Sequence, residues 1–305
     1  MNLLVTGGLG YLGSEILWKA AGHDPGAQLV SMGRSPLPDG LHLPPGTAHE
    51  TGSVMDESRI LELLRRFRIT HVIHTAGPRT SACASNPLEA IENNVLGTRA
   101  VMNAIGSHSL TQTMLFLSTA AVYGGADAPL DEGSPIAPPT PYAVSKAAAE
   151  MVVSGCAARL RVRHVIVRPG FVMGVPTSGA PSRSRLDAHV RKALAERTAG
   201  FRFARRFFVH ALDELAEGIV QLAGREDAEG IFHLPGCATS LEELGSVLGQ
   251  IANAPVETTV DETASLPAHL DATRFDRLFG PSRPPGLATL VLQSAGSMRD
   301  KVEGA

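Results

Sequence analysis

The sequence predicts an α/β protein in which a doubly wound parallel sheet carries a smaller C-terminal lobe. Three observations lead to this fold class. The first 170 residues alternate short apolar runs with helical periodicities, which is typical of βαβ units. A glycine-rich turn follows the first apolar run, and polar or glycine residues follow the later ones. After residue 170 the alternation weakens, which indicates a separate and smaller substructure.

The chain begins with a strand, a glycine turn and a helix. The apolar run Leu3–Val5 is followed by TGGLGYLG, which leads into a helical pattern over residues 10–22. Gly7 permits a tight turn, Gly10 lets a pyrophosphate approach the backbone, and Gly13 lets the helix pack closely on the strand. The helix N-terminus offers free N–H groups and a partial positive charge to phosphates. This setting predicts a Rossmann-type dinucleotide site.

The next elements continue the alternation in order. We expect strands at 28–32, 71–74, 114–117 and 162–167, and helices at 56–67, 87–107 and 141–160. Asp56 and Thr140 suit helix N-caps, and Pro141 suits a first helical turn. Residues 36–46 contain four prolines and two glycines, so we expect an irregular loop there. Parallel strands joined by helices bring their carboxyl ends to one edge, where ligands bind.

Two domains follow from this pattern. Residues 1–170 are expected to form the dinucleotide-binding domain, with 208–228 packing back on it. Residues 171–207 and 229–305 are expected to be two segments that leave that domain and together form a substrate-binding lobe. Beyond residue 170, we expect helices at 186–197, 211–222 and 240–251 and a strand at 231–234.

The composition excludes several classes of protein. The chain has 305 residues, 44% of them hydrophobic and 19% charged, and its net charge is −3, so neither nucleic acid nor a membrane surface is an expected partner. Cys83, Cys156 and Cys237 lack disulfide or metal spacing, which favours a reducing compartment. No histidine–carboxylate cluster predicts a metal. Without an export signal or a run of ~18 apolar residues, we expect a cytoplasmic location.

A tyrosine and a lysine in PYAVSK are candidates for acid–base chemistry. Tyr142 and Lys146 are four residues apart at the start of a helix and therefore share a face. A nearby ammonium is expected to lower the pKa of a tyrosine from about 10. Thr119 adds a hydroxyl at the end of a strand. Such a pair can occur by chance on a solvated helix, but its position after the glycine turn favours proton transfer at an alcohol or carbonyl.

Seven motifs in order make the chain similar to a known family. It resembles the extended short-chain dehydrogenases/reductases of the NAD-dependent epimerase/dehydratase family, over roughly residues 1–255. The motifs are TGGLGYLG, HTAG (74–77), NNVLGT (93–98), STAAVYGG (118–125), PYAVSK (141–146), VRPG (167–170) and RFFVHALDE (206–214).

The resemblance implies a role for each matching residue. The catalytic triad would be Thr119, Tyr142 and Lys146, with Thr119 preferred to Ser118 because it lies four residues before Tyr123. Tyr142 and Lys146 would also contact the cofactor. The remaining cofactor contacts would be Gly7, Gly10, Tyr11, Leu12 and Gly13 at the pyrophosphate, Ala76, Gly77 and Asn94 at the nicotinamide, and Arg168 and Pro169 closing over that end. The resemblance also implies a homodimer through helices 87–107 and 142–160, and it places Asp213 where the second lobe docks.

The end of the second strand bears on the choice of cofactor. NAD-preferring relatives carry an acidic residue there for the ribose 2′-OH. Gly33 takes that place here, and Arg34 and Ser35 could hold a 2′-phosphate, which favours NADP. The alternative is that Arg34 stacks on adenine or is merely exposed, which leaves NAD possible.

Departures from the family pattern bear on the substrate. Ala120-Ala121 replaces the acidic pair of the dehydratases, which argues against dehydration. Residues 170–174 lack the asparagine that holds a sugar nucleotide in many relatives, so such a substrate is not secured by the sequence. The segment 183–206 carries eight basic residues against two acidic ones, which suggests an anionic substrate. Arg205 and Arg206 are the first candidates to bind it, although most of the basic side chains suit a solvated helix.

Three other side chains are weaker candidates for a role in catalysis or substrate binding. His74 and His210 suit buried strand or loop positions better than catalytic ones. Cys83 lies in the segment after HTAG and could approach the substrate. The better interpretation is that its small, uncharged side chain fills space in the packing of the protein.

These observations predict an NADP-dependent oxidoreductase that interconverts a ketone and a secondary alcohol on a polar, anionic or sugar-like substrate. Tyr142 would be its acid/base. One alternative is a nucleotide-sugar epimerase that retains NAD. Another is a non-catalytic dinucleotide-sensing protein on the same fold, against which the intact triad argues.

Overall fold

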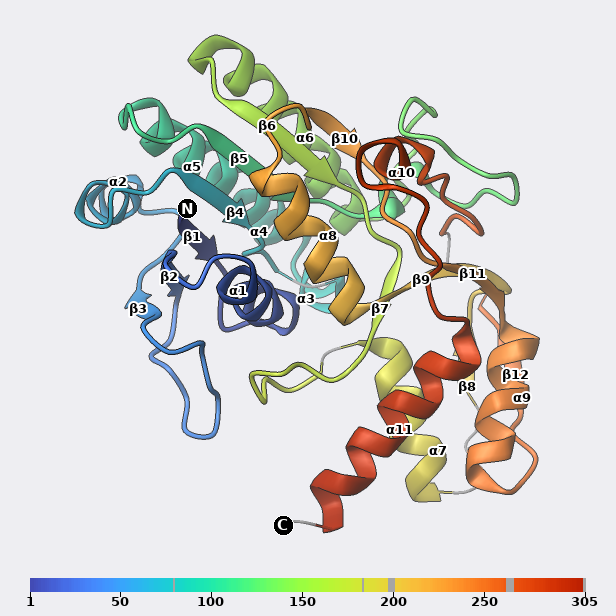
Figure 1. Ribbon diagram of the computed structural model, residues 1–305. Coiled ribbons are helices and arrows are strands. Elements are labelled where there is room, and N and C mark those ends of the chain that lie inside the picture. The colour runs from blue at the N-terminus through green and yellow to red at the C-terminus, as the bar shows by residue number, and fades with distance from the viewer. Residues whose placement is uncertain (79, 183, 197–200, 262–265, 304–305) are drawn as a thin grey trace.

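The computed structural model describes residues 1–305 except 79, 183, 197–200, 262–265 and 304–305. Figure 1 shows a large twisted sheet with helices on both faces, and a second group of helices and short strands beside its carboxyl edge. The N-terminus lies in the large sheet, and the C-terminus lies in the second group.

The large sheet has seven parallel strands in the order β10-β6-β5-β4-β1-β2-β3. The strand order reverses between β1 and β4, which is where an open α/β sheet forms its ligand crevice. The strands are β1 (Asn2–Thr6), β2 (Gln28–Gly33), β3 (Ala48–Thr51), β4 (His71–His74), β5 (Thr113–Leu117), β6 (Arg163–Val167) and β10 (Gly230–Phe232). The predicted fold class, a Rossmann-type doubly wound parallel sheet, is confirmed.

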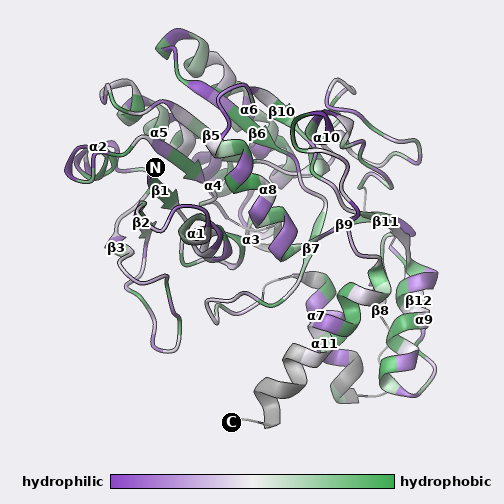
Figure 2. Cartoon of the chain, in the orientation of Figure 1, coloured by the Kyte–Doolittle hydropathy of each residue, from purple (hydrophilic) through white to green (hydrophobic). Residues whose placement is uncertain are grey.

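Both faces of this sheet are covered, because successive side chains of each strand point to opposite sides. Leu3 and Val5 of β1 pack in one core with α1 (Tyr11–His23) and α8 (Leu212–Gly224). Leu4 packs in the other core with α2 (Glu57–Arg66), α5 (Gly97–Gly106) and α6 (Pro141–Leu160). Figure 2 shows the strands as hydrophobic and the outer sides of several helices as hydrophilic.

The smaller lobe has its own core of buried residues, centred on Phe203, Phe207, Leu244 and Val291. Its strands β7, β9 and β11 form one small sheet, and β8 and β12 form another. Their bounds are β7 (Phe171–Met173), β8 (Phe201–Phe203), β9 (Arg206–Ala211), β11 (Cys237–Ser240) and β12 (Thr258–Val260), and the lobe helices are α7 (Arg185–Glu196), α9 (Leu241–Ala252) and α11 (Leu287–Glu303).

Several elements differ from the sequence-based expectation. Strand β10 pairs with β6, so residues 230–232 belong to the large sheet rather than to the lobe expected over 229–305. Helix α10 (Thr273–Phe279) also leaves that lobe, since its Phe275 packs in the core that contains Leu3 and Val5. The single helix expected over 87–107 is α4 (Pro87–Ile91), a π-helical turn η1 (Glu92–Leu96) and α5, preceded by a short α3 (Thr80–Ser85). Neither strand pairing nor an inserted helical residue is visible in local periodicity.

Candidate functional site

The turn between β1 and α1 leaves no room for side chains at its glycines. Gly7 has φ +75°, and a Cβ there would lie 2.9 Å from the backbone nitrogen of Ala76. A Cβ on Gly13 would lie 2.3 Å from the Gly7 carbonyl oxygen, and one on Gly10 would lie 2.9 Å from it. Gly10 is the N-cap of α1 and provides no side-chain cap, so the first N–H groups of the helix remain available to an anion. This geometry suits a dinucleotide pyrophosphate.

Tyr11 and Leu12, two other predicted pyrophosphate residues, direct their side chains elsewhere. The Tyr11 hydroxyl donates to the carbonyl oxygen of Gly174 (2.9 Å) and to Oδ2 of Asp187 (3.1 Å), both of which lie beyond β6 in the chain. Leu12 packs into the core between the sheet and α1. The backbones of these two residues are the groups at the start of α1 that could contact a phosphate, and their role at the cofactor stays a prediction.

The predicted nicotinamide residues Ala76, Gly77 and Asn94 come together after β4. A Cβ on Gly77 would lie 2.4 Å from Oδ1 of Asn94. Asn94 is buried in the η1 turn, and its Nδ2 donates to the Ser145 hydroxyl of α6 (2.8 Å). The π-helical turn therefore places a polar residue of a distant helix beside the turn that follows β4, as such turns often do at functional sites.

The three predicted catalytic residues meet at the carboxyl end of β5. Thr119 follows this strand and caps the short turn η2 (Ala120–Tyr123), with its Oγ1 accepting from the Ala121 N–H (3.2 Å). Tyr142 lies in the first turn of α6, which the Thr140 hydroxyl caps. The Thr119 hydroxyl interacts with Tyr142 and lowers the pKa of its phenol. This pair can hold one oxygen of an alcohol or carbonyl between two hydroxyl groups.

The pKa of Tyr142 differs from the expectation. Burial, with a smaller contribution from Cys83, raises it to about 12, and the interaction with the Thr119 hydroxyl opposes this rise. Lys146 is buried with its ammonium 4.2 Å from the centre of the Phe116 ring, and burial lowers its pKa to about 8. The predicted lowering of the tyrosine pKa is therefore wrong for the chain by itself, because loss of water around the phenol is the largest influence on it and raises its pKa.

Two weaker candidates are buried as expected, and one lies closer to the site. His74 bonds with Thr6 (2.6 Å), and burial lowers its pKa to about 3. His210 bonds with the Pro235 carbonyl oxygen (2.9 Å), and burial lowers its pKa to about 4. Cys83 of α3 is fully buried and interacts electrostatically with Tyr142 and Lys146, so it lies in the neighbourhood of the predicted catalytic residues.

Arg168 does not face the nicotinamide end as the resemblance implied. Its guanidinium is buried and pairs with Glu150 (2.6 Å), and its Nη1 donates to the Tyr123 hydroxyl (2.7 Å). The carbonyl oxygen of Pro169 accepts from the Ala120 N–H (2.8 Å), which ties the end of β6 to the η2 turn. The Arg168 guanidinium thus has its partners within the protein, and the cofactor contact expected of Pro169 stays a prediction.

Sequence analysis did not identify Glu150 or Tyr123 as site residues. One sign was available, because Glu150 stands four residues after Lys146, as Lys146 does after Tyr142.

Arg34 and Ser35 follow β2 and are exposed. The backbone oxygen of Ser35 bonds with Nε2 of His49 (2.9 Å), which holds this turn against β3. Gly33 ends β2 without a side chain that could bind a ribose hydroxyl. The geometry therefore leaves the Arg34 side chain available to a ligand.

Arg205 and Arg206 are both exposed, and β9 begins at Arg206, so Arg205 precedes the strand. Strand alternation puts Arg206 on the same face of β9 as Phe208 and His210. Phe208 on this face packs with Ala120 and Tyr123, beside Thr119. Arg206 is thus the better placed of the two for a substrate at the triad.

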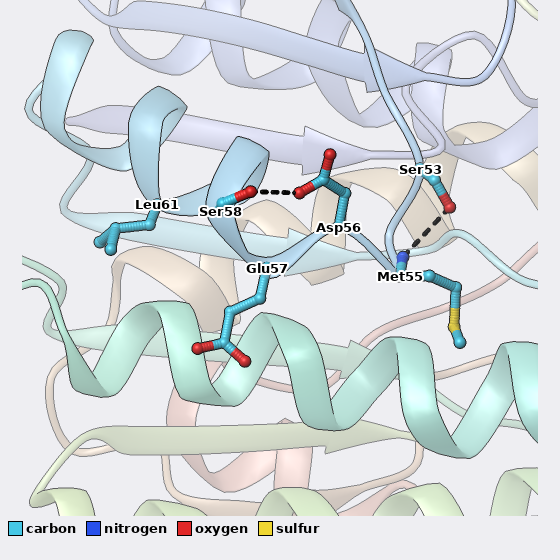
Figure 3. Close-up of a pocket in the computed structure, with 6 residues that line it drawn as sticks. All are labelled: Ser53, Met55, Asp56, Glu57, Ser58 and Leu61. Carbon is cyan, nitrogen blue, oxygen red and sulfur yellow. Dashed lines mark hydrogen bonds between the residues drawn. The ribbon is translucent and has the colours of Figure 1, made fainter.

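A surface hollow is lined by Ser53, Met55, Asp56, Glu57, Ser58 and Leu61 at the start of α2 (Figure 3). Its polar groups bond with one another, Ser58 to Asp56 and the Met55 N–H to Ser53. None of the triad lines it. Among the described residues, no group of three or more His, Cys, Asp or Glu side chains could hold a metal, and no helix is long and apolar enough to cross a membrane.

Known proteins resemble the chain in sequence. The model of the "NAD dependent epimerase/dehydratase family" matches residues 3–233. A UDP-glucose 4-epimerase of Halalkalibacterium halodurans is 25% identical over 282 residues, which are 85% of this chain and 83% of the relative. A dTDP-D-glucose 4,6-dehydratase of Mus musculus is 29% identical over 75% of this chain and 66% of its own length.

Solved structures resemble its fold. A UDP-glucose 4-epimerase of Thermus thermophilus, solved with NAD, has a TM-score of 0.83 at 22% identity over 97% of this chain and 99% of that one. A Thermotoga maritima UDP-glucose 4-epimerase, solved with UDP-glucose, has a TM-score of 0.85 at 19% identity over 99% of this chain and all of that one. The family match covers most of the chain, and the chain therefore belongs to the NAD-dependent epimerase/dehydratase family of short-chain dehydrogenase/reductase enzymes.

Proposed function

We propose that this protein is an NAD-dependent epimerase acting at one secondary alcohol carbon of a nucleotide sugar. The observation that carries the proposal is that Thr119, at the carboxyl end of β5, interacts with Tyr142, at the same sheet edge as the glycine turn. UDP-glucose 4-epimerases are among the relatives in sequence and in structure, which supports this class of substrate. An epimerase that retains NAD, given above as an alternative, thus replaces the NADP-dependent oxidoreductase as the leading interpretation.

In this reaction the phenolate of Tyr142 takes the proton of the sugar hydroxyl as the hydride leaves, and the phenol so formed returns that proton when the hydride is given back. Bound NAD would supply the hydride acceptor and donor at the carbon that carries that hydroxyl. Thr119 holds the reacting oxygen beside the phenol. Lys146, with its pKa of about 8, is largely protonated at neutral pH, so it can supply a positive charge on the helix face that carries Tyr142.

The residues after Thr119 favour epimerisation over dehydration. Ala120 is fully buried and Ala121 follows it in the η2 turn, so this turn brings no carboxyl group to the substrate. Elimination of water from a sugar requires an acid and a base beside the two carbons that change.

A second candidate function is reduction of a ketone with NADPH. The exposed Arg34 and Ser35 at the end of β2 favour it, because the guanidinium could pair with a 2′-phosphate. The two candidates differ in whether the cofactor stays bound between turnovers.

The test begins with identification of any nucleotide released when the purified protein is denatured. The emptied protein is then titrated with NADH and NADPH, and the intact protein is assayed with UDP-glucose for its C4 epimer. Retained NAD and formation of the epimer would support the proposal. An empty site that prefers NADPH, with no epimer formed, would favour the reductase.

We also propose that the protein is a homodimer. Leu88 and Ile91 of α4 and Val144 and Met151 of α6 are exposed, although they are large and apolar. These helices are in contact with each other, so their apolar residues can form one surface for a second copy. Light scattering during gel filtration should give twice the mass of the chain, and Met151→Lys should shift the protein towards monomer.

A further inference from the structure

Helix α6 carries a third polar residue on the face that holds Tyr142 and Lys146. Glu150 follows Lys146 by four residues and is 5% exposed. A buried carboxylate is costly unless it is paired and hydrogen-bonded, so its partners indicate what it is for. The proposed proton transfer does not use it.

Both carboxylate oxygens of Glu150 are occupied. Oε1 accepts a short hydrogen bond from the Ser118 hydroxyl and another from Nε of Arg168 (3.0 Å). Oε2 accepts from Nη2 of Arg168 (2.6 Å). Arg168 extends the network, because its Nη1 donates to the Tyr123 hydroxyl (2.7 Å), which in turn bonds with Nε2 of His233 (2.7 Å).

This network holds both sides of Thr119. Ser118, the residue before it, is tied to Glu150 directly. Tyr123, the last residue of the turn that Thr119 caps, is tied to Glu150 through Arg168. The position of the Thr119 hydroxyl beside Tyr142 therefore depends on a carboxylate that touches neither residue.

The same carboxylate acts on Lys146. Burial lowers the pKa of Lys146, and the negative charge of Glu150 is the largest influence opposing that shift. The titratable and charged groups that face Lys146 are Tyr142 and Glu150 of α6, Cys83 of α3, His74 of β4 and, behind Glu150, Arg168 at the end of β6. Burial keeps His74 and the Cys83 thiol neutral, which leaves Glu150 as the anion among them.

We propose that Glu150 is a positioning residue of the reaction, which fixes Thr119 through Ser118 and Arg168 and keeps Lys146 in its cationic form. The inference rests on the proposed function for its kinetic consequences, but the contact with Lys146 can be measured without any substrate.

The first test is an NMR titration of the full chain labelled at the lysine side chains. The sequence has four lysines, Lys19, Lys146, Lys192 and Lys301, so the Lys146 signal can be assigned from a Lys146→Arg spectrum. In the wild-type chain Lys146 should titrate near 8. In Glu150→Gln the value should fall, because removal of an adjacent negative charge destabilises the ammonium. An unchanged titration would overturn the electrostatic part of the proposal.

The second test separates the charge from the tether. Glu150→Gln should lower kcat by about tenfold to a hundredfold with little change in KM, and Glu150→Asp should restore part of it. At alkaline pH, Lys146 of the Glu150→Gln variant should lose its proton earlier than in the wild type. The activity of Glu150→Gln should therefore begin to decline at a lower pH than the activity of the wild type. Ser118→Ala removes the direct hydrogen bond that ties Ser118 to Glu150, but it keeps the negative charge of Glu150. The kcat should therefore fall by about threefold to tenfold, while the pH dependence of activity stays as in the wild type.

Failure of this inference is distinguishable from failure of the proposed function. If the wild type converts no nucleotide sugar, the epimerase proposal fails, and the lysine titration still tests Glu150. If Glu150→Gln does not fold, as its thermal melting would show, Ser118→Ala decides the tether: full activity would overturn it, and reduced kcat with normal NAD affinity would support it.

Discussion

The large sheet and the smaller lobe build their parts of the site in different ways. At the sheet edge the backbone itself forms the surface, because Gly7 and Gly13 have no space for a Cβ, and buried hydrogen bonds fix Asn94 and Thr119. On the lobe, the candidate substrate contact is the exposed Arg206 at the start of a strand. The glycine turn should therefore tolerate few substitutions, whereas exposed side chains of the lobe can be substituted without disturbing the backbone.

The largest expected effect is at Tyr142, the proposed acid/base at the sheet edge. Tyr142→Phe removes the hydroxyl that carries the proton, and turnover should fall by at least about a thousandfold. NAD affinity, measured by quenching of protein fluorescence, should stay nearly unchanged. A variant with full turnover would show that Tyr142 is not the acid/base.

The next effect tests the backbone of the glycine turn. Gly7→Ala should weaken cofactor binding strongly and cost about 1–3 kcal/mol of stability, because φ is +75° and the new Cβ would meet Ala76. Gly22 near the end of α1 is the matched control, since no atom lies within 4 Å of a Cβ there. Gly22→Ala should stabilise the chain by about 0.5–1 kcal/mol in urea unfolding.

A smaller effect is expected on the lobe. Arg206→Ala should raise KM for an anionic substrate by about tenfold and leave kcat nearly unchanged, because an exposed guanidinium contributes binding in both ground and transition states. Arg205→Ala is the control, as its side chain does not share the β9 face that turns towards Thr119. Equal effects of both changes would mean that general positive charge, rather than strand direction, attracts the substrate.

The smallest effect lies where the two regions meet. Tyr11→Phe removes the hydroxyl that joins the glycine turn to Gly174 and Asp187, and it should lower the free energy of unfolding by about 1 kcal/mol. NAD affinity should change little, since only the backbone of residue 11 is available to phosphate. Loss of NAD binding would show that contact with the lobe is required to shape the cofactor site.

Local patterns identified the elements that local physics forms. The strand–glycine–helix start, the caps at Asp56 and Thr140, and the four-residue spacing of Tyr142 and Lys146 all appear in the structure as expected. The π-helical turn at Asn94 was missed because one extra residue in a helix barely alters its apolar periodicity. Strand β3 was missed because it lies at the edge of the sheet, and its sequence, AHET, has little apolar character.

The sequence by itself determined the Rossmann-type fold, the glycine turn and the shared helix face of Tyr142 and Lys146, because backbone conformation, capping and helical spacing depend on near neighbours. Only the tertiary structure decided that Arg168 pairs with Glu150 instead of facing the cofactor, that β10 joins the large sheet, and that burial raises the pKa of Tyr142. These outcomes depend on groups far apart in the chain, such as Tyr123 and His233, whose meeting is set by packing and loss of water.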